Sequence, residues 1–548
     1  MRAHFGTHPN AAQLWQDTTG NHPPVIAIDT ETVSLKDRTL LGVGIAVSPS
    51  DAFYVSVGDP SFQEVIILLQ NPYVVKVLHN ALYDIRVLRP WGIDVTLVED
   101  TAIMTRLIGL GGVLEEASFY VKTTARSAGD VIDSHGVSTM AELPDSVIAE
   151  KCCEDTLATF QLYEKFKDEV PQKVYQLDRR VIPLLEKVSS KGIRIDQDRL
   201  EHIRKYYQRE YSYYTAVADG IGFNPSKSFE VGYILSEMGE FLPLTKKGRL
   251  STDENVLRGV RSPKAIPIAQ LTLLFRRAQK MLGTYLLPLK DQDRAFTMLH
   301  MNAVTGRING TSAGSNNLDR GLLNLPKRAD LGKPEDLKYR GVFIPNGTRL
   351  TEADANQIEL RVLAHLSGDK RMQWVFANDG DLHSDAEMAI WGSRGTRRDF
   401  AKVFNYSVAY NADVQAIADG IESTDLVRVA AERRKWLDTY TGAASWMNSQ
   451  MIEGPRQGYV ESALGRKMWL PTDREEKHVL NCSINWPIQT FAAEIFKMCI
   501  LECEYLVDWA LLYIHDAQLY EGKVPIPDLS SVSEVHVPWE SKVGDRWS

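Results

Sequence analysis

The stretch from Arg349 to Gly368, RLTEADANQIELRVLAHLSG, constrains the fold of this chain more than any other part of it. Its first residues predict a short strand that ends at Asp354, and a helix is predicted from about Gln357 onward. Asn356 is a plausible N-cap, because its side-chain oxygen can accept a hydrogen bond from an amide of the first turn. The apolar residues expected on the buried face of this helix are Leu360, Leu363 and Ala364. Asp354 is thereby placed at the mouth of a strand-to-helix turn, with Glu359 in the helix. Such acids also have a purely structural explanation, because helix N-termini favour negative charge.

The size and composition are those of an ordinary globular protein with more than one domain. The chain has 548 residues, of which 44% are hydrophobic and 24% charged. No apolar run approaches the ~18 residues of a membrane span, and the first residues lack the pattern of a secretion signal. We therefore expect no membrane contact and a cytoplasmic location. The net charge of −9 means that any contact with nucleic acid must come from local basic clusters. The five cysteines have no zinc-knuckle spacing, and their odd number suits a reducing compartment.

A group of acids is spread over three elements near the N-terminus. The apolar segment 25–32 predicts a strand on which Asp29 and Glu31 point to the same side, since alternate residues of a strand share a face. A second strand, at 74–80, leads into a helix that carries Asp84, and a helix over 147–166 carries Asp155. Carboxylates on one face repel each other unless a cation lies between them, which suggests Mg²⁺ or Mn²⁺. The alternative is a strand end that faces solvent.

The acids Asp29, Glu31, Asp84 and Asp155 resemble the motifs of the DEDD-type 3′–5′ exonucleases. The resemblance implies a ribonuclease H-like domain in which two metal ions activate a water and stabilise the leaving oxygen of a phosphodiester. One position departs from the family, because Lys151 stands where the tyrosine subclass has the Tyr that orients the attacking water. A charged lysine cannot accept the proton of that water. Metal binding is therefore better supported than a full nuclease rate.

The segment 397–411, RRDFAKVFNYSVAYN, predicts a helix with a mixed stripe along one side. Its members recur every four residues and are Arg398, Lys402, Tyr406 and Tyr410. The first half of the stripe is cationic and the second half aromatic, which matches the phosphates and the base of a nucleoside triphosphate. The structural explanation is an amphipathic helix that buries Phe400, Val403, Phe404 and Val408.

The segment 509–520, WALLYIHDAQLY, predicts a pair of strands interrupted at His515 and Asp516. With the two segments above, it resembles motifs A, B and C of the family A (polymerase I-like) DNA polymerases, in family order. The resemblance implies that Asp354 and Asp516 hold the catalytic metal ions and that Glu359 crowds the 2′ position of the sugar. The implied dNTP-binding residues are Arg398, Lys402, Tyr406, Tyr410, His383, Glu359 and Gln357. This chain has Ala517 where motif C has Glu, and Ser407 and Asn411 where motif B usually has Gly.

Further segments resemble the DNA-contacting parts of the same family. They are Thr305-Gly306-Arg307 and Asn324-Leu325-Pro326. Residues 458–466 resemble the hairpin that precedes the last palm helix of the family. The implied DNA-binding residues are Arg307, Asn324, Asn485, Gln489, His515 and Lys227. The loops 224–227 and 246–249 carry amides, hydroxyls and cations suited to phosphates, although solvated loops explain them equally well. The tail after Glu521 has prolines where a helix would be expected.

The expected fold is therefore a multidomain α/β and α+β protein. A ribonuclease H-like 3′–5′ exonuclease domain over 1–172 precedes a right-hand polymerase domain over 173–548. Within the latter we expect a thumb at about 200–296, a palm at about 297–366 and 456–548, and fingers at about 367–455. The compact chain resembles phage-encoded replicative polymerases, which would place it in a host cytoplasm.

The expected function is template-directed addition of dNTPs to a primer 3′ end, with 3′–5′ proofreading. Two Mg²⁺ ions, with Mn²⁺ as an alternative, are implied at each active site. The implied partners are primer–template DNA, dNTPs and replication proteins such as a helicase, a primase or a single-strand binding protein, with the chain as a monomer. One rival is an exonuclease whose polymerase site is weakened or silenced by Ala517. Another is a DNA-binding protein in which both sites are inactive.

Overall fold

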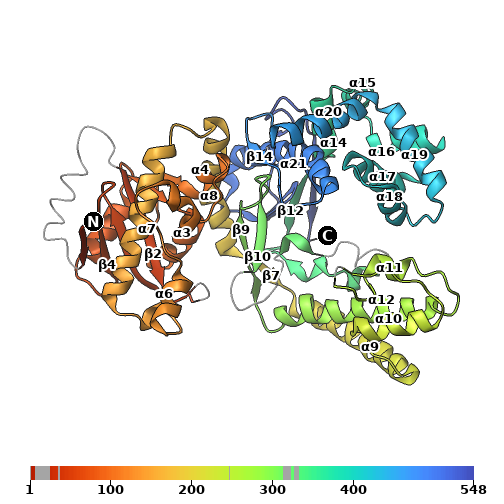
Figure 1. Ribbon diagram of the computed structural model, residues 1–548, viewed down its shortest axis with the longest axis horizontal. Coiled ribbons are helices and arrows are strands. Elements are labelled where there is room, and N and C mark those ends of the chain that lie inside the picture. The colour runs from red at the N-terminus through yellow and green to blue at the C-terminus, as the bar shows by residue number, and fades with distance from the viewer. Residues whose placement is uncertain are drawn as a thin grey trace.

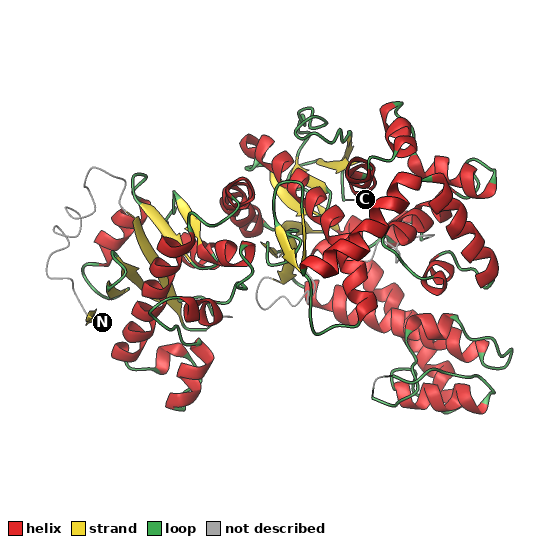
Figure 2. Ribbon diagram, turned by 45° about the horizontal axis from the view of Figure 1, so that its top comes forward, coloured by secondary structure: helices red, strands yellow, loops and turns green. Residues whose placement is uncertain are grey.

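The computed structural model describes residues 2–5, 25–34, 37–245, 247–312, 322–325 and 333–547. An N-terminal α/β part lies at one end of the molecule, and a larger part built on a second sheet lies at the other (Figure 1). Helices cover the sheets and form most of the larger part (Figure 2). Within the described residues, no helix combines the length and the apolar character needed to cross a membrane.

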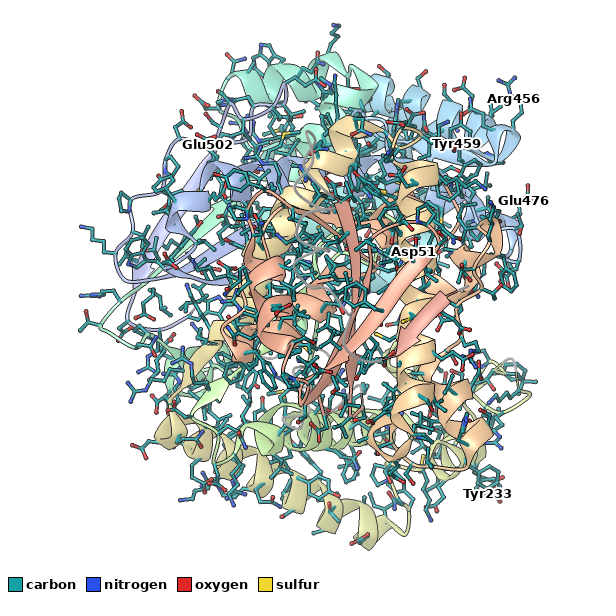
Figure 3. All side chains as sticks on the ribbon, turned by 90° about the vertical axis from the view of Figure 1, so that its left-hand side faces the viewer. Asp51, Tyr233, Arg456, Tyr459, Glu476 and Glu502 are labelled. Carbon is teal, nitrogen blue, oxygen red and sulfur yellow. The ribbon has the colours of Figure 1, made fainter. Side chains whose placement is uncertain are left out.

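The N-terminal part is a six-stranded mixed sheet in the order β1-β4-β3-β2-β5-β6. Its strands are β1 (Arg2–Phe5), β2 (Val25–Thr32), β3 (Leu40–Ala46), β4 (Asp51–Ser56), β5 (Val75–Leu78) and β6 (Val98–Asp100). The long helix α7 (Asp145–Phe166) packs across β2, β3 and β4, and α3 (Ala81–Leu88) follows β5. The predicted strands and helices are thus confirmed here. Figure 3 views this sheet from the N-terminal end, with Asp51 at the start of β4.

A helical segment connects the two parts and then projects as an arm. Helix α8 (Gln172–Lys191) leads to β7 (Ile193–Ile195), which pairs with β8 (Arg294–Ala295) and β11 (Phe343–Ile344). The arm contains α9 (Gln197–Ile221), α10 (Ser228–Glu237), α11 (Glu254–Arg258) and α12 (Ile266–Lys280), of which α9 and α12 pack together. Tyr233 of α10 points outward at its surface (Figure 3).

The second sheet is antiparallel, in the order β15-β16-β12-β17. Its strands are β15 (Ala510–Ile514), β16 (Ala517–Glu521), β12 (Leu350–Ala355) and β17 (Trp539–Gly544). Helix α21 (Glu476–Glu502) covers one face of this sheet. Its Phe496 stacks there on Trp539 of β17 at a centroid distance of 6.3 Å. The other face of β12 carries Asp354, since consecutive residues of a strand point to opposite faces.

Helix α14 (Ile358–Ser367) follows β12, and it buries Leu360, Leu363 and Ala364 as predicted. The predicted N-cap is wrong, because Gln357 occupies that position with φ 54° and makes no side-chain cap bond. Asn356 instead lies in the turn between β12 and α14, and its amide donates to the carbonyl of Pro538 at 2.9 Å. That contact comes from residues 522–538 of the tail, which the structure describes in full and which form no helix.

The remaining helices gather above the sheet, beyond α14 (Figure 1). They are α15 (Lys370–Ala377), α16 (Leu382–Trp391), α17 (Arg398–Ala409), α18 (Val414–Gly420), α19 (Leu426–Thr439) and α20 (Thr441–Gln457). Phe404 and Val408 of α17 are buried as predicted, whereas Phe400 is 45% exposed. The prediction for Phe400 is wrong because residues 394–400 are all exposed, and none of the residues that the structure describes covers this turn. The predicted hairpin forms from β13 (Tyr459–Glu461) and β14 (Lys467–Trp469).

Candidate active sites

The two acids predicted for the larger site come together at the end of the second sheet. Asp354 lies at the end of β12, and Asp516 lies in the tight turn between β15 and β16. The amide of Ala355 donates to the carbonyl of Asp516 at 2.9 Å, and Asp354 is in register with Ala517. Both acids are half-buried, and His515 beside them is exposed with φ 49°.

Helix α17 presents its tyrosines to these acids. Burial and the nearby carboxylates of Asp516 and Asp354 raise the pKa of Tyr406 to about 12. The rings of Tyr406 and Tyr410 lie 6.2 Å apart, and His383 lies 5.8 Å from Tyr406. The predicted aromatic end of the stripe therefore faces the carboxylate pair.

The cationic end of the stripe lies farther along α17. Arg398 donates to Asp381 at 2.5 Å, and Lys402 is exposed. Gln357 also reaches Asp381, with its amide nitrogen 3.3 Å from the carboxylate. His383 is only 2% exposed, and its Nδ1 lies 3.0 Å from the amide nitrogen of Asn405. Its contact with a phosphate stays a prediction.

A third group joins α14, α17 and α21 beside the carboxylate pair. Glu359 forms an ion pair with Arg307 and accepts a hydrogen bond from the hydroxyl of Tyr410. Gln489 of α21 also bonds to Tyr410. Four predicted site residues from distant parts of the sequence are thus in direct contact.

Other predicted DNA-binding residues lie apart from this group. Lys227 is on the helical arm, where its ammonium group pairs with Glu230 at 2.9 Å. Asn485 is half-buried on α21, and its side-chain oxygen has no hydrogen-bond partner among the described residues. The side chain of Asn324 lies outside the described part of the chain.

The N-terminal acids also converge, as the sequence predicts. Asp29, Glu31 and the sulfur of Cys152 have ligand atoms within 4.8 Å of one another. Asp84 accepts two hydrogen bonds from Thr30, at 3.0 Å from the amide and 2.7 Å from the hydroxyl. Burial raises the pKa of Asp84 to about 7, and burial together with Asp155 and Glu31 raises that of Asp29.

Lys151 lies inside this cluster rather than at its rim. Its ammonium group is 2.9 Å from Glu31 and 2.7 Å from Asp155. Burial raises the pKa of Asp155 to about 6, although Lys151 lowers it. The residues present therefore do not fit two metal ions, because a protein cation already bridges two of the four acids.

Sequence reasoning missed several contributors. Cys152 was not linked to the acids, although it directly follows Lys151 on α7. A buried charge cluster formed by Asp178, Arg466, Glu494 and Lys497 connects α8 to α21 and the hairpin. Glu540 was missed because its strand pairs with β12 from far along the chain.

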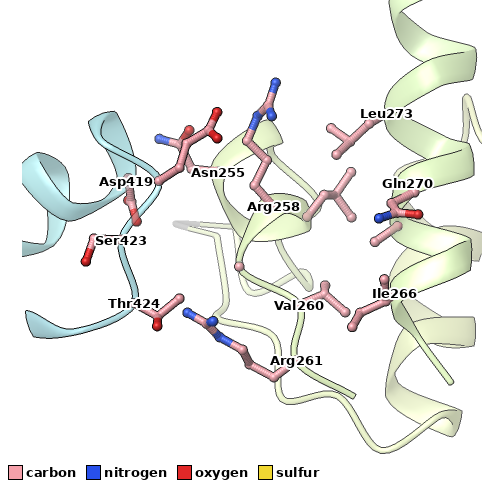
Figure 4. Close-up of a pocket in the computed structure, with 14 residues that line it drawn as sticks. Asn255, Arg258, Val260, Arg261, Ile266, Gln270, Leu273, Asp419, Ser423 and Thr424 are labelled. Atoms are coloured by element: carbon pink, nitrogen blue, oxygen red, sulfur yellow. The ribbon is translucent and has the colours of Figure 1, made fainter. Parts of the chain in front are cut away.

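A separate cavity of about 300 Å³ lies between the arm and the loop after α18 (Figure 4). Arg258 and Arg261 line one side, and Asp419 lies on the other. None of the residues predicted for the two sites is among its described lining.

Comparison with known proteins follows the same division of the chain. Residues 197–526 match DNA polymerase family A, and residues 10–171 match a 3′–5′ exonuclease family. DNA polymerase I of Chloroflexus aurantiacus is 28% identical over 91% of this chain and 57% of its own length. DNA polymerase I of Pseudomonas aeruginosa is 24% identical over 95% of this chain and 63% of its own length. The chain therefore spans less than two thirds of these bacterial relatives, and the expected likeness to phage polymerases stays a prediction.

Among solved structures, the chain is similar to the polymerase domain of Pol1 from M. smegmatis in complex with DNA primer-template and dNTP. The TM-score is 0.80 at 19% identity, and the match covers 99% of both chains, which shows a shared fold. The family match spans more than half of the sequence and contains both Asp354 and Asp516. The chain thus belongs to DNA polymerase family A and carries an N-terminal 3′–5′ exonuclease domain.

Proposed function

We propose that this chain is a template-directed DNA polymerase that adds dNTPs to the 3′ end of a primer. The observation that carries the proposal is the pair Asp354 and Asp516, half-buried and side by side at the end of β12. Tyr406 and Tyr410 face these two aspartates, and the ion pair of Arg307 and Glu359 lies beside them. The M. smegmatis relative, which holds primer-template and dNTP, supports the substrate class.

The donor set of this site fits two Mg²⁺ ions, with Mn²⁺ as an alternative. Asp354 and Asp516 offer hard carboxylate oxygens, which both ions prefer. When bound, such ions activate the primer hydroxyl and stabilise the leaving pyrophosphate. Asp354 and Asp516 would hold these ions at the end of the second sheet, where both side chains are half-buried.

The neighbouring side chains are proposed to orient the incoming nucleotide. Arg398 and Lys402 would neutralise its phosphates. Arg398 would keep an anionic partner when it moves from Asp381 to a phosphate. The rings of Tyr406 and Tyr410 would stack on base and sugar. Glu359 is held by Arg307 and Tyr410, so its carboxylate is fixed where it can crowd a 2′-hydroxyl.

We further propose the domain limits given by the family resemblance. The arm at about 200–296 would be the thumb, the second sheet with its helices the palm, and residues 367–455 the fingers. DNA would contact Arg307, Asn324, Asn485, Gln489, His515 and Lys227. Accessory replication proteins, a monomeric state and a cytoplasmic location stay predictions.

A second activity is proposed for the N-terminal domain, which is slow removal of nucleotides from a 3′ end. The observation that favours it is the convergence of Asp29, Glu31, Asp84 and Asp155. The activity is expected to be weaker than polymerisation, because Lys151 cannot take a proton from the attacking water while it is charged.

Primer extension on an end-labelled template tests both activities. With dNTPs and Mg²⁺ we expect the primer to lengthen to the template end, and with EDTA we expect no change. Omission of dNTPs should reveal the slower shortening of the primer. A primer that shortens but never lengthens at any Mg²⁺ or Mn²⁺ concentration would favour the rival in which Ala517 silences the palm. Binding without either change would favour the DNA-binding rival.

A further inference from the structure

We propose that the ammonium group of Lys151 takes the place of one of the two metal ions in the N-terminal site. The site would then accept at most one divalent ion. This inference rests on the exonuclease-type arrangement proposed above, and it concerns the occupancy of the site rather than its activity.

The position of Lys151 carries the inference. Its Nζ lies 2.9 Å from Oε1 of Glu31 and 2.7 Å from Oδ2 of Asp155, so one cation bridges acids from β2 and α7. The three side chains are 6–9% exposed, which excludes bulk water from the contacts. Lys151 and Asp155 are one helical turn apart, so the backbone of α7 fixes their spacing.

The charge balance supports the same conclusion. A buried ammonium group is costly unless it is paired, and its carboxylate partners are equally costly alone. Lys151 meets this requirement, because its ammonium group contacts Glu31 at 2.9 Å and Asp155 at 2.7 Å and so balances charge on two buried acids.

A metal ion cannot share the bridging position with this group. A divalent ion would use the same two carboxylate oxygens at about 2.1 Å, and it would lie within a few ångströms of the ammonium charge. The remaining donors surround Asp29, where Cys152 lies 3.5 Å away and Oδ1 of Asp155 has no hydrogen-bond partner among the described residues. The ligand atoms of Asp29, Glu31 and Cys152 lie within 4.8 Å of one another, so this group would hold one ion.

The number of bound ions can be measured without any catalysis. The protein for this test carries Asp354→Ala and Asp516→Ala, which remove the palm carboxylates, and Mn²⁺ is titrated while free Mn²⁺ is followed by electron paramagnetic resonance. We expect no more than one Mn²⁺ bound with Lys151 present and one additional Mn²⁺ in Lys151→Met. Lys151→Arg, which keeps the charge, should leave the number unchanged. Lys173→Met, at an exposed position on α8, is the matched control.

Thermal unfolding gives a second readout. Lys151→Met should lower the melting temperature in EDTA, because the acids lose their cation, and Mn²⁺ should restore most of the loss. The unsubstituted site should show a smaller response to Mn²⁺. Two ions bound in the presence of Lys151, or an unchanged number in a folded Lys151→Met protein, would overturn the proposal. Complete lack of nuclease activity would refute the proposed exonuclease but leave this count unaffected.

A different observation leads to a second inference, which rests on the proposed polymerase function. We infer that Glu540 supplies the third carboxylate of the palm, which Ala517 does not provide. Asp354 is in register with Ala517 of β16 on one side and with Glu540 of β17 on the other. Directly opposed residues of antiparallel strands point to the same face, with Cβ atoms about 4.5–5.5 Å apart.

The other residues of β17 fix the direction of this side chain. Trp539, the preceding residue, stacks on Phe496 of α21, so Glu540 points to the opposite face, on which Asp354 lies. Glu540 is exposed, and its Oε1 is 3.5 Å from the side-chain amide of Asn356. The Glu540 side chain can therefore rotate toward a metal ion bound beside Asp354.

Glu540 is a positioning residue in this view, since it acts through the ions held by Asp354 and Asp516. Loss of such a supporting group typically weakens metal affinity or activity by about 10–100-fold. We expect Glu540→Gln to raise the Mn²⁺ concentration needed for half-maximal binding, measured without DNA or dNTP, by about tenfold. The Mg²⁺ dependence of single-nucleotide incorporation should shift in the same direction.

Two further variants separate this role from a structural one. Glu540→Asp should retain most of the affinity, and Ala517→Glu should restore it in the Glu540→Gln protein by supplying the acid from the other side of Asp354. Ser541→Ala, on the same strand but the opposite face, is the control. Unchanged metal binding in Glu540→Gln would overturn the inference. A native protein without polymerase activity at any metal concentration would instead refute the proposed function.

Discussion

The hydroxyl of Tyr410, at the end of α17, donates a hydrogen bond to the carboxylate of Glu359 in the first turn of α14. Arg307 pairs with the same carboxylate from a third part of the chain. A side chain held from two directions can define the edge of a sugar pocket. The contact therefore links the helix proposed to bind nucleotide to α14, the helix that follows the strand carrying Asp354.

Replacement of Glu359 tests this edge. Glu359→Ala should increase ribonucleotide incorporation relative to deoxynucleotide by about tenfold or more, because a pocket rejects an added hydroxyl only through such close contacts. The ratio of single-nucleotide incorporation rates for the paired substrates measures the effect. An unchanged ratio would remove Glu359 from the sugar site.

Tyr406 is expected to affect a different substrate pair. Tyr406→Phe removes the hydroxyl that faces the two aspartates and should reduce the use of dideoxynucleotides relative to deoxynucleotides. Competition between the two substrates on one template gives the ratio directly. Equal ratios for both proteins would place the hydroxyl outside the nucleotide site.

The carboxylate pair should be essential for extension and dispensable for binding. Asp354→Ala or Asp516→Ala removes a metal ligand but no phosphate contact, so extension should fall by more than about 100-fold while fluorescence anisotropy reports nearly unchanged primer–template affinity. Asp473→Ala, at a position 78% exposed, is the control for loss of one acid. Extension near the native rate in either palm variant would contradict the assignment.

The N-terminal site should act independently of the palm. The double variant Asp29→Ala and Glu31→Ala should remove 3′–5′ degradation and leave polymerisation intact. Lys151→Tyr should increase degradation, because it removes the bridging cation and supplies a group that can orient water. Degradation of single-stranded DNA that persists in the double variant would place the nuclease activity elsewhere.

The buried His383 predicts a pH dependence of stability. Burial lowers its pKa to about 4, whereas an unfolded chain has a histidine pKa near 6.5. Between these values the unfolded state binds more protons, so the free energy of unfolding should fall as pH falls from about 6.5 to about 4. His383→Gln should flatten this slope in denaturant titrations. Equal slopes in the native protein and the variant would show that His383 titrates normally in the fold.

Local patterns of the sequence were sufficient to predict much of the fold. The apolar run before Asp29, the periodicity after Asp354 and the break at Asp516 each predict an element that the structure contains. These features depend on residues close in sequence. Their assembly into one site follows from the family resemblance rather than from the patterns themselves.

Contacts between distant segments could not be predicted in the same way. The spacing of Lys151 and Asp155 places both on one face of α7, but only the packing of that helix on β2 shows that the ammonium group reaches Glu31. Asn356 does not cap α14, because Gln357 takes the N-cap position and the side-chain oxygen of Asn356 accepts a hydrogen bond from the side-chain amide of Gln357 at 3.2 Å. Phe400 fits an amphipathic pattern, yet no part of the chain described by the structure covers its turn, and it is 45% exposed.

The order in which the strands of the second sheet are synthesised leaves β12 without its neighbours for some time. Strand β12 is flanked on both sides by strands made later, with β16 beginning at Ala517 and β17 at Trp539. At about 5–20 residues per second, a ribosome needs on the order of ten seconds or more to supply both neighbours. During that interval β12 has two unpaired edges, which are the usual template for misassociation between chains. Slower translation of the later segments should therefore lower the yield of soluble protein, whereas the N-terminal domain can fold before β12 is made.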